Sequence, residues 1–598
     1  ERVETFLGST RLAILDLSAN GHQPMPDPAT GNWISFNGEI YNFRELLAEL
    51  KIADPRLTTR SQTDTEVILK AYARWGRDCV RRLRGMFAFA LWDQGRQELF
   101  LARDRLGIKP LYYYDHEGTF LFASEVRAIL ASGLVLRRLD PVGVWGYLAY
   151  QSVPAPRTLI QGIRVLPPGS WMTVDSQGTI TGGRYWDLLE DASPDARSAT
   201  REECRRRVRD LLREAISIHL VSDVPLGIFL SGGIDSSTVV ALMCELGQVP
   251  RTFSVIFREQ AYNEARHAQQ VASRFHTDHV EILLGEQDLL TQLPEALAAM
   301  DQPTGDGVNT YVISRAVRSA GLTVALSGLG GDEFFGGYPS FRRLSKVGGL
   351  LRLWGRTPRA FRSLAGWMVE ALGRSSVTAI KLASLVKSDG TLDATFPVTR
   401  QVFSDRERHA LLENGWISEG DGTRDSYVQL LKEAYDRAPE SELFSRVSYG
   451  EARTYMHDVL LRDTDQMSMA HALEVRVPLL DHKLVEYVMG LPDAHKRPNG
   501  TPKRLLVESL DGLLPKEIVR RPKQGFTLPF EPWMRGDFRG FCEERLGPER
   551  LGGRGLFRPE RLQSLWQDFL AGRRHVSWAR LWLLVALEEW LERNGVEL

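Results

Sequence analysis

Residues 226–237, LGIFLSGGIDSS, have the types and spacing of a phosphate-binding loop. An apolar run as long as a buried strand breaks into serines and glycines, and an apolar helical pattern follows. A strand, a glycine-rich turn and a helix point backbone N–H groups at an anion, which glycines allow to approach the main chain. The predicted ligand-binding residues are Phe229, Leu230, Ser231, Gly232, Gly233, Asp235, Ser236 and Ser237.

Two acidic residues, Asp235 and Asp332, predict a magnesium site. Asp235 would repel a phosphate unless a divalent cation bridged the two. Asp332 lies in residues 327–338, SGLGGDEFFGGY, where five glycines follow another apolar run. Each aspartate alone is typical of a helix cap or a turn. At the ends of neighbouring strands, they favour a shared Mg²⁺.

The surrounding pattern predicts the elements that position these loops. Strand-like and helical runs alternate from residue 205 onward, which favours a doubly wound parallel sheet followed by a helical C-terminal part. Residues 340–440 form a helix-rich basic insert whose arginines alternate with apolar residues, so a solvated helix face is expected. Residues 1–190 are strand-rich, with a first strand expected at 11–16, and residues 191–204 have the composition of a linker.

Composition restricts the class of protein. The chain has 598 residues, more than one core usually organises, and a net charge of -1, so no nucleic-acid surface is expected. No apolar run is long enough for a membrane span. The four cysteines lack metal or disulfide spacing, which favours a cytoplasmic protein.

The first half resembles the glutaminase domain of class II glutamine amidotransferases. The resemblance rests on Arg11-Leu12, the NGEIYN run at 37–42, Thr63-Asp64, and the segments 84–89, 104–111 and 123–125. It implies a layered α+β domain of the Ntn-hydrolase type, αββα. It also implies that glutamine is held by Arg11, Asn37, Gly38, Glu39 and Asp64. Without the resemblance, Asn37-Gly38 reads most simply as a hairpin turn.

The nucleophile of that family is an N-terminal cysteine whose own amino group serves as base. The chain begins with Glu1, and none of its cysteines suits this role. We expect a preceding segment to carry the cysteine. The alternative is a glutaminase domain kept only as structure.

The second half resembles the synthetase domain of glutamine-hydrolysing asparagine synthetases. The match continues through Asp463, residues 474–481 and residues 503–506 and 521–526. It implies that ATP and Mg²⁺ activate a carboxylate, aspartate by default, as an acyl-adenylate that ammonia then attacks. Further nucleotide contacts would come from Val255, Ser327 and Gly328, and catalytic charge from Lys503 and Lys523. The family also makes a homodimer possible.

One departure leaves the acceptor open. Leu329 stands where asparagine synthetases usually carry an acid, and leucine cannot bind an ammonium or transfer a proton. The same chemistry on a carboxylate of polysaccharide or specialised metabolism is therefore the alternative. A non-catalytic binding or regulatory protein on this fold is the alternative of another class. Lys503 and Lys523, judged without the resemblance, would be interpreted as ordinary surface lysines.

Overall fold

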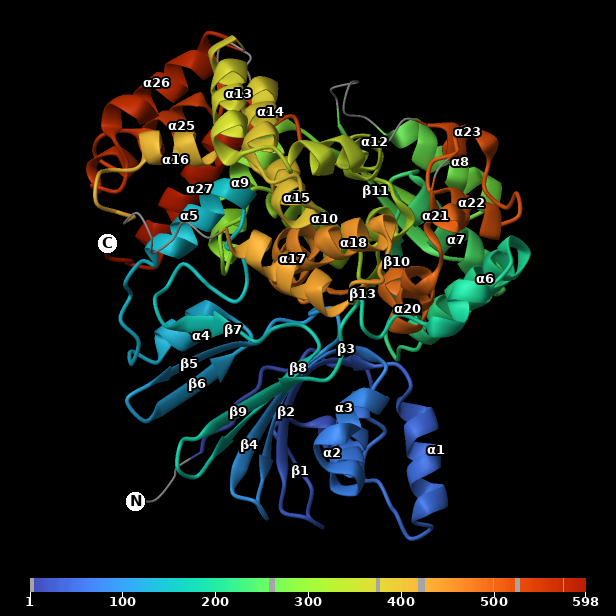
Figure 1. Ribbon diagram of the computed structural model, residues 1–598. Coiled ribbons are helices and arrows are strands. Elements are labelled where there is room, and N and C mark those ends of the chain that lie inside the picture. Colours follow the sequence, from blue (N-terminus) through green and yellow to red (C-terminus); the bar gives the residue numbers. More distant parts are fainter. Residues whose placement is uncertain are drawn as a thin grey trace.

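The computed structural model describes residues 5–257, 264–372, 377–417, 425–497, 499–521, 528–573 and 575–598. Its two halves are stacked along the long axis of the molecule (Figure 1). The antiparallel strands of the first half form the lower part of the view. The parallel sheet and most helices form the upper part.

The first half contains two antiparallel sheets. The larger has the order β1-β2-β3-β4-β8-β9, and the smaller has the order β6-β5-β7. The strands are β1 (Met25–Pro26), β2 (Trp33–Ile40), β3 (Gly85–Asp93), β4 (Glu98–Arg103), β5 (Tyr112–His116), β6 (Thr119–Ala123), β7 (Ile163–Val165), β8 (Ser170–Asp175) and β9 (Ile180–Arg184).

Side chains of β3 alternate between two cores, as successive residues of a strand point to opposite faces. Phe87 and Phe89 pack in the core beneath the helices, whereas Ala88 and Ala90 pack between the two sheets. The order of layers is helix, sheet, sheet, helix, which confirms the predicted αββα class. The helices are α1 (Phe43–Ala53), α2 (Asp64–Trp75) and α3 (Cys79–Arg82) on one side, α4 (Val126–Ala131) on the other, and α5 (Pro141–Tyr150).

The second half contains a five-stranded parallel sheet of order β12-β11-β10-β13-β14. The strands are β10 (Leu226–Phe229), β11 (Arg251–Phe257), β12 (Asp278–Leu284), β13 (Val324–Leu326) and β14 (Glu474–Arg476). The chain builds outward from β10 to β12 and then returns to the other side of β10. This order confirms a doubly wound sheet and puts its switch point between β10 and β13, where ligands bind in such folds.

Helices make up most of the remaining second half. Those between the strands are α6 (Arg201–His219), α7 (Ile234–Glu245), α8 (Ala265–Phe275), α9 (Glu286–Ala299) and α10 (Val308–Ser319). Those between β13 and β14 are α11 (Gly331–Phe335), α12 (Pro339–Trp354), α13 (Arg359–Leu372), α14 (Val377–Lys387), α15 (Leu392–Arg400), α16 (Asp405–Leu411), α17 (Ser426–Arg437), α18 (Leu443–Glu451), the π-helical Ala452–Leu461 and α19 (Arg462–Met469). The last are α20 (His482–Gly490), α21 (Asp493–Lys496), α22 (Arg504–Ser509), α23 (Lys516–Arg520), α24 (Phe530–Arg535), α25 (Arg539–Leu546), α26 (Pro559–Leu570) and α27 (Trp578–Arg593). In the described ranges, none of these helices has the length and apolar character needed to cross a bilayer.

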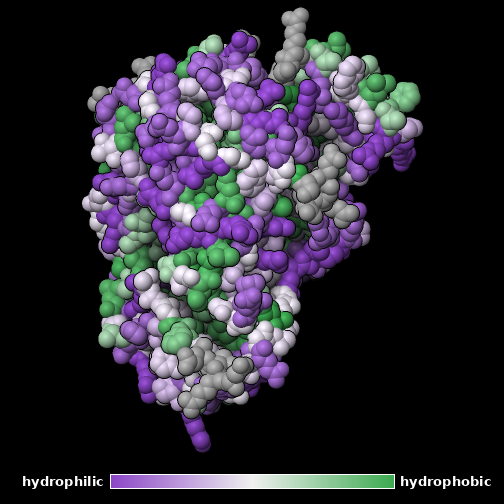
Figure 2. Space-filling model, turned by 90° about the vertical axis from the view of Figure 1, so that its left-hand side faces the viewer, coloured by the Kyte–Doolittle hydropathy of each residue, from purple (hydrophilic) through white to green (hydrophobic). Residues whose placement is uncertain are grey.

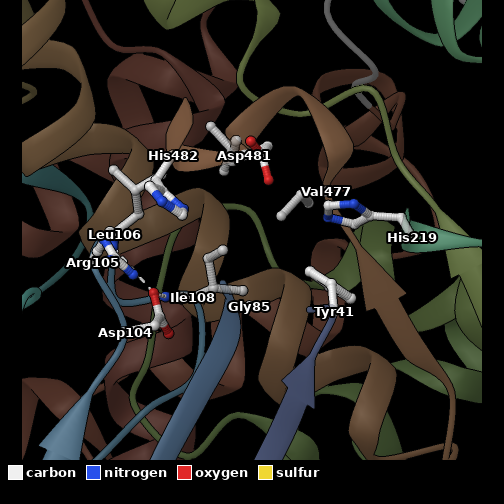
Figure 3. A pocket seen from close by; sticks show the side chains of 11 residues that line it. Tyr41, Gly85, Asp104, Arg105, Leu106, Ile108, His219, Val477, Asp481 and His482 are labelled. Atoms are coloured by element: carbon white, nitrogen blue, oxygen red, sulfur yellow. Dashed lines mark hydrogen bonds between the residues drawn. The ribbon is translucent and has the colours of Figure 1, made fainter. Parts of the chain in front are cut away.

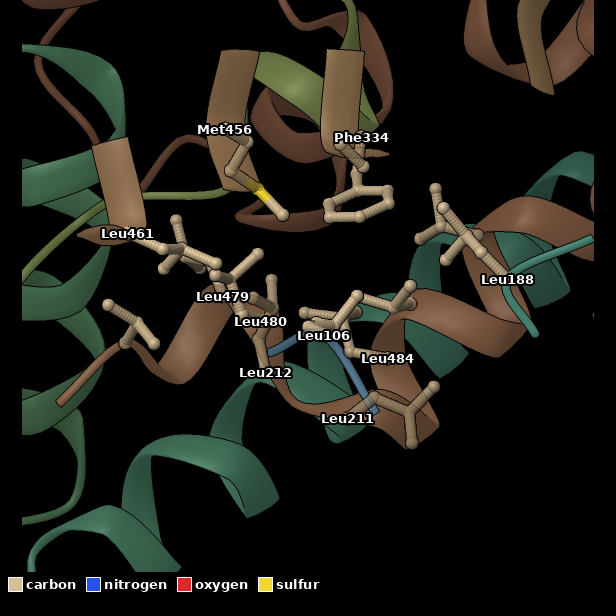
Figure 4. Packing of buried hydrophobic residues seen from close by; sticks show 14 of the residues in the cluster. Leu106, Leu188, Leu211, Leu212, Phe334, Met456, Leu461, Leu479, Leu480 and Leu484 are labelled. Carbon is tan, nitrogen blue, oxygen red and sulfur yellow. The ribbon is translucent and has the colours of Figure 1, made fainter. Parts of the chain in front are cut away.

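The two halves share a hydrophobic core (Figure 4). Leu106 of the first half belongs to the same cluster as Leu212 of α6 and Leu484 of α20. A buried ion pair crosses the boundary beside it: Arg84 donates through Nε and Nη2 to both carboxylate oxygens of Asp481, at 2.7 and 2.8 Å. The halves are therefore joined by packing and charge as well as by the linker.

Two local predictions from the sequence are wrong. Residues 11–16 do not form a strand, because the Arg11 guanidinium donates to the carbonyls of Leu15 and Asp16 and curls the segment on itself. Asn37-Gly38 is not a turn but the middle of β2, where Gly38 pairs with Phe87. A Cβ on Gly38 would lie 2.0 Å from the Met86 carbonyl oxygen, so close contact between strands explains this glycine.

Candidate functional site

The loop after β10 is preorganised by its own hydroxyls. The Ser231 and Ser236 hydroxyls lie 3.2 Å apart, and the Gly233 N–H donates to Ser231 Oγ at 3.3 Å. Gly232 has a φ of 68°, and a Cβ there would meet the backbone of α8 at 2.6 Å. The turn therefore ends at the N-terminus of α7, and the backbone N–H groups and dipole of a helix N-terminus favour an anion.

The loop after β13 packs directly against this one. A Cβ on Gly328 would lie 2.7 Å from the Ser236 nitrogen, and one on Gly331 would lie 2.2 Å from Asp235 Oδ1. The glycines are needed because the two loops meet at the switch point of the sheet. Strand order, which the sequence could only suggest, brings Ser327 and Gly328 beside the phosphate loop.

Lys503 joins the two aspartates predicted to bind a metal. Its Nζ lies 2.6 Å from Asp332 Oδ1 and also pairs with Asp235 Oδ2. Burial lowers the pKa of Lys503, but the two carboxylates raise it more, so the net pKa is above the ordinary value and the ammonium is retained. Two carboxylates beside the predicted phosphate loop are a suitable partial ligand set for Mg²⁺, which takes its remaining oxygens from phosphates and water. In the described part of the chain, no cluster of three or more metal-binding side chains exists.

These groups line one large cleft of about 1300 Å³. Its walls include Phe229, Val255, Ser327, Leu329 and Lys503. Val255 comes from the strand next to β10, so residues from neighbouring strands share one opening. Two of the predicted nucleotide residues, Gly232 and Ser237, are not among those that line it, and Ser237 is 0% exposed. Lys523 lies outside the described residues.

Two acids of the cleft are Asp306 and Asp463. Sequence reasoning gave no role to Asp306 and cited Asp463 only for resemblance. Burial raises the pKa of Asp306 to about 6. Burial and the charge of Asp306 raise the pKa of Asp463 to about 8, although Thr304 Oγ1 donates to both of its carboxylate oxygens. Within the described ranges, no lysine or arginine forms a salt bridge with either acid. The signal that could have found Asp306 is an acidic residue among glycines just before a helix.

The acids predicted to hold glutamine also lie together. Asp64 Oδ2 accepts from the Ile40 N–H at 2.8 Å, and burial raises the pKa of Asp64 to about 7. Burial and the Asp64 charge raise the pKa of Glu39 well above its usual range. Arg476 of β14 lies 3.5 Å from Glu39 Oε1, so a cation of the second half partly compensates this site.

Arg11 and Asn37, which were also predicted to hold glutamine, form hydrogen bonds with groups other than these acids. Asn37 Nδ2 donates to Ser124 Oγ at 3.4 Å, and Gly38 is inside β2. The contacts of the Arg11 guanidinium are to its own loop. A bidentate contact of Arg11 with a bound carboxylate would require these contacts to change.

A small cavity of about 20 Å³ lies where the halves meet (Figure 3). Tyr41 and Asp104 reach it from the first half, and His219, Asp481 and His482 reach it from the second. Burial lowers the pKa of His219 to about 3, so this histidine is neutral at physiological pH. The cavity has room for about one water-sized molecule.

Two family models match the two halves of the chain. The asparagine synthase model matches residues 207–592, and the glutamine amidotransferase domain model matches residues 1–186. The chain belongs to the asparagine synthase family. The predicted resemblance is therefore confirmed, with a glutamine amidotransferase domain preceding the synthase part.

Relatives of this family cover most of the chain. Asparagine synthetase [glutamine-hydrolyzing] 1 of Bacillus subtilis is 31% identical over 89% of this chain and 81% of its own length. Asparagine synthetase [glutamine-hydrolyzing] 3 of the same organism is 31% identical over 88% of this chain and 80% of its own. Amidase chry2 of Gibberella zeae is 29% identical over 89% of this chain and 82% of its own. These relatives support the predicted enzyme class, an ATP-dependent amidotransferase ligase.

Proposed function

We propose that this protein transfers the amide nitrogen of glutamine to a carboxylate activated by ATP, with aspartate as the default acceptor. The observation that carries the proposal is the convergence of Asp235, Asp332 and Lys503 on a glycine-lined phosphate loop at the switch point of a parallel sheet. A lone glycine-serine turn would need none of these charged partners.

In the first half, Glu39 and Asp64 accept hydrogen bonds from the α-ammonium of glutamine. A bound ammonium would compensate the two neighbouring acids and lower their raised pKa values. Arg11 takes the α-carboxylate, and Asn37 and Gly38 complete the pocket. The nucleophilic cysteine remains a prediction from the resemblance. The cavity between the halves is a candidate part of the path along which ammonia moves.

In the second half, an oxygen of the acceptor carboxylate attacks the α-phosphorus of ATP and pyrophosphate leaves. Ammonia then attacks the acyl carbon, and AMP departs with the bonding electrons. Ser231, Gly233 and Ser236 bind pyrophosphate through hydroxyl and backbone N–H groups, whereas the predicted Ser237 is 0% exposed and supports the loop through its N–H bond to the Gly233 carbonyl. Asp235 and Asp332 would hold Mg²⁺, which neutralises phosphate charge when bound. Lys503 and Lys523 supply further positive charge to the phosphates.

Leu329 and the fungal relative favour a second candidate for the acceptor. Leucine offers no proton acceptor at this wall of the cleft, and the relative at 29% identity is named an amidase and not an asparagine synthetase. The same chemistry on another carboxylic acid is therefore the alternative. Dimerisation and a cytoplasmic location remain predictions of the sequence.

The test is product formation by the full-length protein with ATP, Mg²⁺, aspartate and either glutamine or ammonium chloride. Asparagine and pyrophosphate in equal amounts support the proposal, whereas pyrophosphate and amide only with another acid support the second candidate. Asp235→Asn should abolish both products. Asp278→Asn is the matched control, because Asp278 is an exposed acid at the opposite end of the same sheet. No pyrophosphate with any acid would favour a non-catalytic protein.

A further inference from the structure

The helices α12 and α13 carry apolar side chains that the rest of the chain leaves uncovered. On α12 these are Val347, Leu350 and Leu353, which are 38, 70 and 61% exposed. On α13 they are Phe361, Leu364, Trp367, Met368 and Leu372, between 46 and 83% exposed. Figure 2 shows apolar side chains at the surface of the upper end of the molecule, where α13 and α14 lie in Figure 1.

Helical spacing places four of these residues on one side of α13. Phe361, Leu364, Met368 and Leu372 follow the i, i+3, i+7, i+11 pattern, so they lie along one side of α13. The other side packs on α14, where a Cβ on Gly366 would lie 2.4 Å from Lys387 Cγ. The exposed stripe is therefore the side of α13 that faces away from the protein. Exposed apolar side chains gathered along one side of a helix, unlike singly scattered ones, mark a site of interaction with a protein or a membrane.

The same region carries unneutralised positive charge. Six basic residues are exposed from α12 to the first residue of α13, namely Arg342, Arg343, Lys346, Arg352, Arg356 and Arg359. Among the described residues, none of the six forms a salt bridge. From residue 339 to 372, Glu370 is the sole acid, and it pairs with Lys387. The sequence-based expectation of an ordinary solvated helix face does not account for this combination.

We propose that this α12–α13 surface, made of the eight apolar and six basic residues named above, binds an anionic phospholipid membrane from one side. Aromatic and aliphatic residues combined with arginine are the composition of helices that lie in the membrane interface. Anionic head groups complement the basic charge, and each basic residue near such a surface adds to binding. A second copy of the chain is disfavoured, because a two-fold contact would oppose two basic patches.

The surface adjoins the candidate active cleft. Arg342, Arg343 and Lys346 at the start of α12 line that cleft, and the first exposed apolar residue of α12, Val347, follows directly. A membrane bound there would lie next to the opening through which the acceptor enters. The inference does not depend on which acceptor is used.

The test is co-sedimentation of the full-length protein with vesicles. Vesicles of equal parts phosphatidylcholine and phosphatidylglycerol should bind it, vesicles of phosphatidylcholine alone should bind it much less, and added salt should weaken binding. Reversal of three charges in Arg352→Glu/Arg356→Glu/Arg359→Glu should lower the partition coefficient by at least about 100-fold, since each basic residue contributes about fivefold. Phe361→Ser/Trp367→Ser/Leu372→Ser should lower it independently through lost apolar contact.

Matched controls lie on the far half of the molecule. Ile52→Ser/Leu136→Ser replaces apolar residues that are 83 and 75% exposed, and Arg56→Glu/Arg60→Glu/Arg138→Glu reverses three exposed charges. Both controls should bind vesicles as the unchanged protein does. Absence of binding to anionic vesicles at low salt would overturn the proposal. So would a sedimentation experiment in which the Phe361→Ser/Trp367→Ser/Leu372→Ser variant converts a dimer to a monomer while vesicle binding is unchanged.

Discussion

Replacement of Lys503 by methionine removes one positive charge from the candidate active cleft. Its ammonium lies 2.6 Å from Asp332 and also pairs with Asp235, and its side chain is 7% exposed. Methionine keeps most of the aliphatic volume but removes the charge. The substitution therefore leaves two carboxylates of the cleft without this cation.

The structure sets the size of the effect. At an effective dielectric constant of 20, charges 2.6 Å apart attract by roughly 6 kcal/mol before desolvation is counted. Breaking a buried ion pair costs about 3–5 kcal/mol in practice. The aspartate side chains keep 18 and 22% exposure, so the cost should be at the lower end of this range. We therefore expect Lys503→Met to lower the free energy of unfolding by about 3 kcal/mol. Loss of one positive group at a charged transition state should lower the rate of adenylation by about 10²–10³-fold.

Pyrophosphate release with saturating ATP and acceptor measures the rate, and the midpoint of urea unfolding measures stability. Lys503→Arg should retain stability better than Lys503→Met because it retains the charge, whereas its larger planar group should still impair turnover. Lys516→Met is the matched control, since Lys516 is exposed on α23 and forms no salt bridge in the described part of the chain. Unchanged pyrophosphate release by Lys503→Met would refute the reasoning that this cation serves the phosphates.

Three further predictions follow from other contacts. Arg84→Met should lower the free energy of unfolding by about 3–5 kcal/mol, because it removes the ion-pair partner of the 2%-exposed Asp481 carboxylate between the halves; an unchanged urea midpoint would contradict this role. Asp463→Asn should flatten the pH dependence of stability: the native pKa of about 8 exceeds the ordinary 3.8, so the contribution present at acid pH is lost as pH rises from about 4 to 8. Each pKa unit is worth about 1.4 kcal/mol. Between about pH 4 and 8, the urea midpoint should therefore fall more steeply with pH for the unchanged protein than for Asp463→Asn. Gly331→Ala should reduce pyrophosphate release at least about 10-fold, because its Cβ would lie 2.2 Å from Asp235 Oδ1; full activity would show that the loop can move aside.

Local patterns in the sequence predicted many of the helices and strands of both halves. Short apolar runs predicted β10 and β13, and a helical apolar pattern predicted α6. Each of these patterns depends only on residues close together in the sequence. The error at residues 11–16 shows the limit of this reasoning. An apolar run is compatible with a strand or an extended coil, and the contacts of Arg11 with Leu15 and Asp16 decide between them.

The motifs predicted that Asp235 and Asp332 would lie at the ends of neighbouring strands, but they could not specify the contacts between the two loops. Asp235 and Asp332 are nearly a hundred positions apart, and only the parallel pairing of β10 with β13 brings them to one edge. The bridge formed by Lys503 could not be predicted, because it depends on how a later helix packs over that edge.

The sequence by itself determined the family and the order of the two halves, and it predicted a phosphate-binding loop after β10, because these inferences depend on residue types at short spacing. The tertiary structure decided the pairing of acids in the cleft, the contact of Arg476 with Glu39 across the halves, and the uncovered stripe on α13. Burial and charge neutralisation depend on what each side chain meets after folding. Those neighbours come from segments hundreds of residues away.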